Sequence, residues 1–227
     1  MSELSRRRFI WYAIAVAAGG GGFLLPSVSH SFYGLRPPAA LKESTFLATC
    51  IKCGQCVQVC PYHSVTLLDM NYGVAAGTPV IKPDERGCYL CDLLPCVLAC
   101  PSSALDHSVD DAFGVSMGKA YIDNIKDCLS YKESRLTDEN IASLTDGKPE
   151  KTDVERKLNQ TLKSRVSTDC DLCERYCPFP EKENAIGFVS ENGKRIPEIR
   201  EKCVGCGVCV ELCPVNIIKI IPVDRRV

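Results

Sequence analysis

The chain has 227 residues, with 27 Lys and Arg against 28 Asp and Glu, so its formal net charge is −1. This balance excludes the strongly basic surface of a general nucleic-acid-binding protein. Apolar residues make up 45% of the chain, which argues against wholesale disorder, but only 7% of residues are aromatic and 16 are cysteine. We therefore expect a cysteine framework of disulfides, zinc sites or iron–sulfur clusters.

The first 29 residues resemble an export signal. Arginines at positions 6 to 8 precede Phe9 and an apolar stretch that ends near residue 25. The stretch is interrupted by glycines and is shorter than the roughly 20 residues that a spanning helix needs. Ser-Arg-Arg-x-Phe is typical of a twin-arginine signal, which carries folded proteins, so we predict export to the periplasm. The small residues 27–29 offer a cleavage site, and an uncleaved signal that acts as a membrane anchor remains the alternative.

Residues 30–49 are interpreted as a linker to the first cysteine loop. Beyond it, the 16 cysteines form four groups of four. Groups one and four have the spacing C-x2-C-x2-C-x3-C-P, group two has a second gap of four residues, and group three has one cysteine far upstream of the others. In chain order the groups are Cys50, Cys53, Cys56 and Cys60; Cys88, Cys91, Cys96 and Cys100; Cys128, Cys170, Cys173 and Cys177; and Cys203, Cys206, Cys209 and Cys213.

This spacing is that of bacterial ferredoxins, in which the fourth cysteine of a group binds the other cluster of a pair. Three closely spaced cysteines form a loop whose N–H groups face the cluster, and Gly54, Gly205 and Gly207 suit such a close backbone approach. We expect the fourth cysteine to begin a helix, with the following proline fixing the start of that helix. Four Cys-Pro endings disfavour zinc, and the regular spacing disfavours disulfides. The sequence thus predicts four [4Fe–4S] clusters with all sixteen cysteines as iron ligands.

The fold class expected is α+β, built from tandem or nested dicluster ferredoxin-like units. Residues 50–130 hold groups one and two with Cys128, and residues 170–227 hold the remaining cysteines. Short apolar runs after the Cys-Pro pairs, at 65–68, 104–105, 185–189 and 217–221, are predicted to form strands that cover the clusters. The extended chain expected at 35–38 comes from its consecutive prolines.

Residues 131–169 break the pattern, because they contain no cysteine and many charges of both signs. Val154, Leu158 and Leu162 recur every fourth residue, which predicts an amphipathic helix. The favoured interpretation is a solvated surface insertion, and the alternative is an arm that docks a partner. His30, His63 and His107 have no metal-ligand spacing and are interpreted as surface residues. No nucleotide loop, catalytic triad or haem motif is found, so we expect no substrate chemistry on this chain.

The chain resembles the NapG/MauM family of periplasmic ferredoxin-type proteins, nearer the NapG branch, over nearly its whole length apart from 131–169. The resemblance rests on the twin-arginine start, on L-R-P-P at 35–38 and on C-I-K-C-G-Q-C-V-Q-V-C-P-Y at 50–62. It also includes A-G-T-P at 76–79, C-P-S-S-A-L-D at 100–106, M-G-K-A at 117–120 and C-D-L-C at 170–173. The long insertion between Cys128 and Cys170 departs from the family pattern.

What the resemblance implies is electron transfer in periplasmic nitrate respiration. Electrons would pass from a membrane quinol-oxidising iron–sulfur partner, similar to NapH, toward periplasmic nitrate reductase, directly or through a cytochrome. The protein would be peripheral to the cytoplasmic membrane, held by that partner or by an uncleaved signal. Two alternatives stay open: a β-like electron-transfer subunit of a molybdoenzyme, and an accessory factor for maturing a periplasmic redox enzyme.

Cluster pairing is either sequential, joining groups one with two and three with four, or nested. Group two, with Pro95 in its longer gap, resembles the second group of the β subunits of DMSO-reductase-type enzymes, which favours nesting. Nested pairing joins Cys50, Cys53 and Cys56 with Cys213; Cys203, Cys206 and Cys209 with Cys60; Cys88, Cys91 and Cys96 with Cys177; and Cys128, Cys170 and Cys173 with Cys100.

Overall fold

The computed structural model describes residues 34–148, 150–191 and 193–223. The predicted signal or anchor at 1–29 lies outside these residues, and no helix within them is long and apolar enough to cross a membrane. The helices are α2 (Glu43–Thr49), α3 (Gln55–Gln58), α4 (Pro95–Leu98), α5 (Asp138–Thr145), α6 (Asp153–Lys163), α7 (Leu172–Arg175), α8 (Lys182–Ala185) and α9 (Val208–Glu211), with 3-10 turns η1 (Met70–Ala75), η2 (Ala112–Gly114) and η3 (Ile125–Asp127). The strands are β1 (Val65–Leu67), β2 (Pro79–Ile81), β3 (Gly118–Ile122), β4 (Ile186–Glu191), β5 (Lys194–Ile199) and β6 (Ile218–Pro222).

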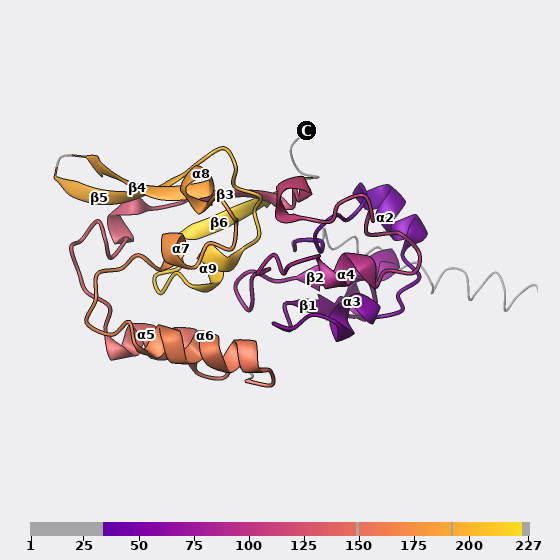
Figure 1. The fold of residues 1–227 in the computed structure, drawn as a ribbon, viewed down its shortest axis with the longest axis horizontal. Helices are drawn as coiled ribbons and strands as arrows, with labels where there is room; N and C mark the ends of the chain where they lie inside the picture. The colour runs from indigo at the N-terminus through magenta and orange to yellow at the C-terminus, as the bar shows by residue number, and fades with distance from the viewer. Residues whose placement is uncertain (1–33, 149, 192, 224–227) are drawn as a thin grey trace, which may run out of the picture.

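A first module contains α2, α3, α4 and the antiparallel pair β1–β2, which lie together in Figure 1. Helix α3 contacts α4 and β1. The described residues before the first cysteine belong to this module, because Leu35 pairs with Ile81 and both side chains are buried. Phe46 of α2 is likewise fully buried. The segment interpreted from the sequence as a linker therefore contributes Leu35 and Phe46 to the core.

A second module contains α7, α8, α9 and two antiparallel strand pairs, β4–β5 and β3–β6. Helix α7 contacts α9, as α3 contacts α4 in the first module. The β4–β5 hairpin is local, whereas β3 pairs with the distant β6 in the register Gly118 to Pro222. Three of the four predicted apolar runs thus contain strands, and the run at 104–105 makes only an isolated bridge from Leu105 to Ala40.

Helices α5 and α6 contact one another and form the insertion, which extends below the second module toward β1 in Figure 1. The predicted amphipathic helix is confirmed as α6, and Thr152 begins it with a capping box. The solvated interpretation is wrong for the inner face, because Ile141, Leu144, Leu158 and Leu162 are all buried. Charged residues are abundant here because they cover the outer face of a short two-helix hairpin.

One hydrophobic core joins the three parts. It includes Phe46 and Leu94 of the first module, Leu162 of the insertion, and Val208 and Leu212 of the second module. Burial of each such side chain contributes about 1.5–3 kcal/mol to folding. The two modules and the insertion therefore pack as one body around shared apolar side chains.

Candidate metal centres

Four short helices have equivalent places in the four cysteine groups. Helices α3, α4, α7 and α9 each carry one cysteine and end shortly before a Cys-Pro pair. The expectation that the fourth cysteine begins a helix is wrong, because Cys60 follows α3 and is succeeded by a turn. A single helical turn between the two cysteines directs their side chains to different places.

The residue before three of these helices has a left-handed backbone. Gly54 precedes α3 with φ 73°, and Gly207 precedes α9 with φ 90°. This conformation favours glycine, which explains both positions. Leu94 takes the same place before α4 with φ 40°, followed by Pro95 at the start of the helix. The longer gap of group two therefore keeps the helix and its N-terminal turn without a glycine.

In the first module the cysteines form two sets. In each set, the first three cysteines of one group are joined by the last cysteine of the other group. Set A surrounds a pocket bordered by Phe46 and Leu105, and set B surrounds a pocket bordered by Tyr62 and Tyr89. Set A is Cys50, Cys53, Cys56 and Cys100, and set B is Cys88, Cys91, Cys96 and Cys60.

The second module repeats this exchange. In set C, Cys170 and Cys173 face Cys128 and Cys213 closely enough for the sulfur charges to interact. Five cysteines line a pocket with Phe179 and Ile186. Four of them form set D, and the fifth, Cys173, also interacts with Cys128, Cys170 and Cys213 and belongs to set C. Set C is Cys128, Cys170, Cys173 and Cys213, and set D is Cys203, Cys206, Cys209 and Cys177.

The pairing is therefore sequential, and the nested pairing favoured from the sequence is wrong. Cys100 meets set A and Cys60 meets set B, so groups one and two complete each other. Cys213 meets set C and Cys177 meets set D. The physical reason is local, because α3 packs on α4 and α7 packs on α9. Each loop thus lies beside the loop of its own module.

Burial dominates the electrostatics of the sulfurs. Burial, together with the nearby sulfurs of Cys50 and Cys100, raises the pKa of Cys56 to about 11. Burial is likewise the main reason that the pKa of Cys206 rises to about 12; the N–H of Val208 opposes burial, and the sulfur of Cys177 adds to it. Free thiols at these positions are neutral at pH 7, so metal binding must displace their protons.

Backbone amides oppose burial at other sulfurs. The N–H of Ser64 donates to Cys60 Sγ at 3.3 Å. Burial alone would raise the pKa of Cys100, but the N–H of Leu105 and the donors of Ser102 outweigh it and lower that pKa. The N–H groups that follow these two cysteines thus stabilise negative charge on sulfur.

The donor chemistry of the four sets fits an iron–sulfur cluster. Sets A, B and D each line a pocket whose other walls are largely apolar. In set C, Cys128 and Cys213 belong to a buried apolar cluster. Thiolates are the ligands of iron–sulfur clusters. Among the residues that the structure describes, no three Cys, His, Asp or Glu side chains converge on a position for a single metal ion.

Several residues near the sets make contacts that the sequence does not predict. Tyr62 and Tyr89 stack beside set B, with ring centroids 4.1 Å apart. Burial raises the pKa of Tyr62, and the Cys91 sulfur adds to the rise. His63 Nδ1 lies 3.0 Å from the buried Glu155, a long-range contact that no local spacing indicates.

The other two histidines differ in position. His107 is exposed, and its Nε2 lies 3.0 Å from the carbonyl oxygen of Cys100. His30 lies outside the described part of the chain.

The family described as "4Fe-4S dicluster domain" matches residues 49–104 and 168–217. The first range encloses groups one and two, and the second encloses group four and three cysteines of group three. Cys128 lies outside both ranges. Each matched range therefore coincides with one module of the fold, in agreement with sequential pairing.

Curated relatives match far more of the chain. The ferredoxin-type protein NapG of Haemophilus influenzae is 32% identical over 96% of this chain and 72% of its own length. NapG of Escherichia coli K12 is 29% identical over 96% of this chain and 86% of its own length. The methylamine utilization ferredoxin-type protein MauM of Methylorubrum extorquens is 31% identical over 79% of this chain and 67% of its own length. No solved structure matches. With two cysteine-rich modules and relatives of both names over most of its length, the chain belongs to the NapG/MauM family of ferredoxin-type iron–sulfur proteins.

Proposed function

We propose that this protein is a periplasmic electron relay that holds four [4Fe–4S] clusters, one in each of sets A to D. It passes electrons from a membrane quinol-oxidising iron–sulfur partner, similar to NapH, toward periplasmic nitrate reductase or a cytochrome. The observation that carries the proposal is the exchange of the fourth cysteine within each module. This exchange creates four complete ligand sets from sixteen cysteines.

When bound, such clusters supply one-electron redox chemistry at potentials between about −700 and +450 mV. The chain's own residues bind the irons and exclude water. They also donate N–H groups to sulfur, as Ser64 does to Cys60. Burial and hydrogen bonding of this kind set the potential within that range. A relay of this kind makes and breaks no substrate bond, so it needs no acid–base pair.

The proposed location rests on the Ser-Arg-Arg-x-Phe start and the short apolar stretch after it. A protein that is loaded with metal before export must cross the membrane folded, and the twin-arginine route serves that need. The shared core supports this requirement, because both modules and the insertion pack as one body. Attachment to the membrane then depends on the partner or on an uncleaved signal.

The test is an EPR-monitored redox titration of the full-length protein, purified without oxygen, with iron counted on the same sample. The proposal expects about sixteen irons per chain and at least one cluster with a potential that quinol can reduce. Far fewer irons, or clusters that are all too reducing for quinol, would contradict the quinol relay.

A second candidate, suggested by the resemblance to the MauM branch, is an accessory role in maturing a periplasmic redox enzyme; the MauM relatives are named for methylamine utilization. Deletion of the gene distinguishes the two roles. A relay leaves its partner enzyme mature but without electrons, so an artificial donor restores activity. A maturation factor leaves the partner enzyme without its cofactor, and the same donor restores nothing.

A further inference from the structure

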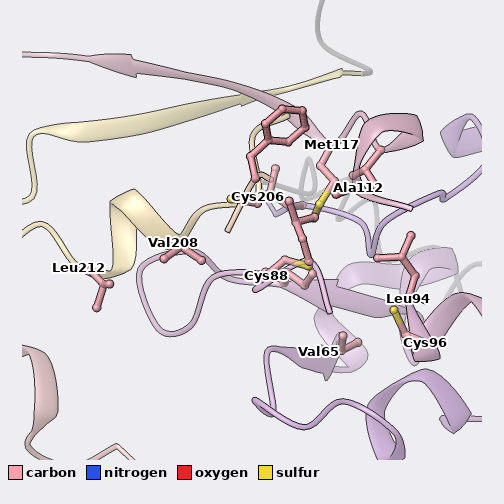
Figure 2. Close-up of a cluster of buried hydrophobic side chains, with 14 of the residues drawn as sticks. Val65, Cys88, Leu94, Cys96, Ala112, Met117, Cys206, Val208 and Leu212 are labelled. Carbon is pink, nitrogen blue, oxygen red and sulfur yellow. The ribbon is translucent and has the colours of Figure 1, made fainter. Parts of the chain in front are cut away.

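The two modules meet where the loop of set B touches the loop of set D. The N–H of Cys88 donates to the carbonyl oxygen of Cys206 at 2.7 Å. Beside it, a Cβ on Gly87 would lie 2.4 Å from the backbone nitrogen of Val208, closer than real atoms approach. Figure 2 shows Cys88 between Val208 of the second module and Leu94 of the first. The backbones of the two modules are therefore in contact at Cys88 of set B and Cys206 of set D.

A buried ionic cluster adjoins this crossing. Arg86 is 6% exposed and lies between two carboxylates that come from different parts of the chain. Its guanidinium nitrogens lie 3.8 Å from Glu155 of α6 and 3.5 Å from Glu211 of α9. Among the described residues, neither terminal nitrogen makes a hydrogen bond within normal limits. Charge therefore holds this guanidinium between the first module, the insertion and the second module.

The carboxylate of Glu211 connects the ionic cluster to the crossing itself. Its Oε2 accepts the N–H of Gly87 at 2.8 Å and the hydroxyl of Tyr89 at 3.1 Å. Its Oε1 accepts from Lys148 at 2.8 Å, which attaches the chain between α5 and α6. Glu211 thus contacts the residues on both sides of Cys88.

The carboxylate of Glu155 attaches α6 to the first module. It is fully buried and lies 3.0 Å from His63 Nδ1. Its other oxygen accepts the N–H of Lys151 and of Thr152 at 2.8 and 3.1 Å. The formal charges of Glu155 and Glu211 balance those of Arg86 and Lys148, so the buried group as a whole is neutral. Loss of one member leaves an uncompensated buried charge, which is costly.

We propose that Arg86, Glu155 and Glu211 are positioning residues that hold the Cys88–Cys206 crossing closed, and that the insertion exists to supply part of this clamp. The crossing then fixes sets B and D relative to each other for electron exchange between the modules. This part of the inference rests on the proposed function, whereas the clamp itself does not. In this proposal the insertion acts within the molecule.

The test compares Arg86→Gln and Glu155→Gln with Arg156→Gln, a control on α6 whose guanidinium pairs with Asp153 at the surface. Three quantities are measured on the full-length, iron-loaded protein. They are iron per chain, the magnetic interaction between reduced clusters seen by EPR, and hydrogen exchange of the backbone at 86–90 and 204–208. The iron count reports on the proposed function, and hydrogen exchange reports on the clamp.

We expect Arg86→Gln and Glu155→Gln to keep their iron, to speed exchange in both loops about tenfold or more, and to weaken the interaction between modules. Arg156→Gln should match the unaltered protein, and Arg86→Lys should restore part of the protection because it restores the charge. Unchanged exchange and unchanged magnetic interaction in Arg86→Gln overturn the clamp.

If the whole fold depends on this network, Arg86→Gln and Glu155→Gln will not fold. Lys148→Gln then replaces them, because this side chain lies at the edge of the cluster and is partly exposed. We expect it to speed exchange in both loops severalfold while iron is retained. Exchange that stays unchanged in Lys148→Gln, or that rises only within 131–169, overturns the clamp.

Discussion

At the scale of single residues, Cys100 distinguishes sequential from nested pairing. It completes set A with Cys53, whereas nesting would place it with Cys170. We expect Cys100→Ala and Cys53→Ala each to remove or convert one cluster, and the double variant to lose no further cluster. Two ligands of one cluster are not independent, so their effects do not add. Iron counting and EPR spectra provide the measurement.

The control combines Cys100→Ala with Cys170→Ala, whose effects should add because the two residues belong to sets A and C. Additive loss in the Cys53 and Cys100 pair, together with no further loss in the Cys100 and Cys170 pair, would falsify sequential pairing.

A pair of glycines with nearly the same φ separates backbone strain from steric clash. Gly205 and Gly54 have φ of 70° and 73°, but only Gly205 faces backbone, with a Cβ position 2.4 Å from Gly118. Gly54→Ala should cost about 1–2 kcal/mol for the left-handed conformation alone. Gly205→Ala should cost about 1–3 kcal/mol more, because it forces the loop away from β3. Unfolding in denaturant, followed by circular dichroism without oxygen, measures both variants, and equal losses contradict the packing.

At the scale of elements, α6 depends on its inner face. Leu162 is 1% exposed and belongs to the shared core, whereas Val154 on the same helix is 37% exposed. Leu162→Ala should lower the free energy of unfolding by about 2–5 kcal/mol, because it leaves a cavity. Val154→Ala should change it by no more than about 0.5 kcal/mol. Similar effects of the two substitutions on denaturant unfolding would show that α6 does not pack as described.

How α6 is held explains what the sequence could and could not predict. Val154, Leu158 and Leu162 recur every fourth residue, and this local periodicity is enough to predict the helix. Nothing local indicates that Glu155 is buried, because charged residues are mostly exposed and its partner His63 is far away in the chain. Such a contact depends on the tertiary arrangement alone.

Cluster pairing escaped prediction for a related reason. The sixteen cysteines and three of the four strand runs follow from local spacing and composition. All four groups carry nearly the same motif, so spacing alone cannot show which Cys-Pro cysteine meets which loop. Contacts between α3 and α4, and between α7 and α9, decide this, and the cysteine spacing does not encode them.

At the scale of the whole molecule, we expect the insertion to detach from the first module in acid. Burial alone would raise the pKa of Glu155, but the contact with His63 and the N–H groups of Thr152 and Lys151 outweigh burial and lower that pKa. Arg86 faces the same carboxylate, and Glu211 and Lys148 lie beyond Arg86. A lowered pKa means that the folded state binds the proton less tightly than the unfolded state. This stabilisation is complete above the ordinary value of 4.5 and disappears as pH falls through the lowered value.

Limited proteolysis of residues 131–169 between pH 6 and pH values below 4.5 measures this response. Cleavage of the unaltered protein should accelerate as pH falls. Glu155→Gln should be cleaved faster at pH 6 and should respond less to acid, because it cannot gain the proton. The same acceleration in both proteins would assign the effect to other carboxylates.

The pairing of β3 with β6 also imposes an order on synthesis. Strand β3, at Gly118–Ile122, pairs in the described structure with a strand made about a hundred residues later. Set C begins at Cys128 and receives its last sulfur from Cys213. A ribosome makes a chain from the N-terminus, and early domains fold first. The first module can therefore acquire its metal while translation continues, whereas the second must wait until Cys213 and β6 have been made. A chain released before that point would hold complete ligand sets in its first module only, with free thiols in the second.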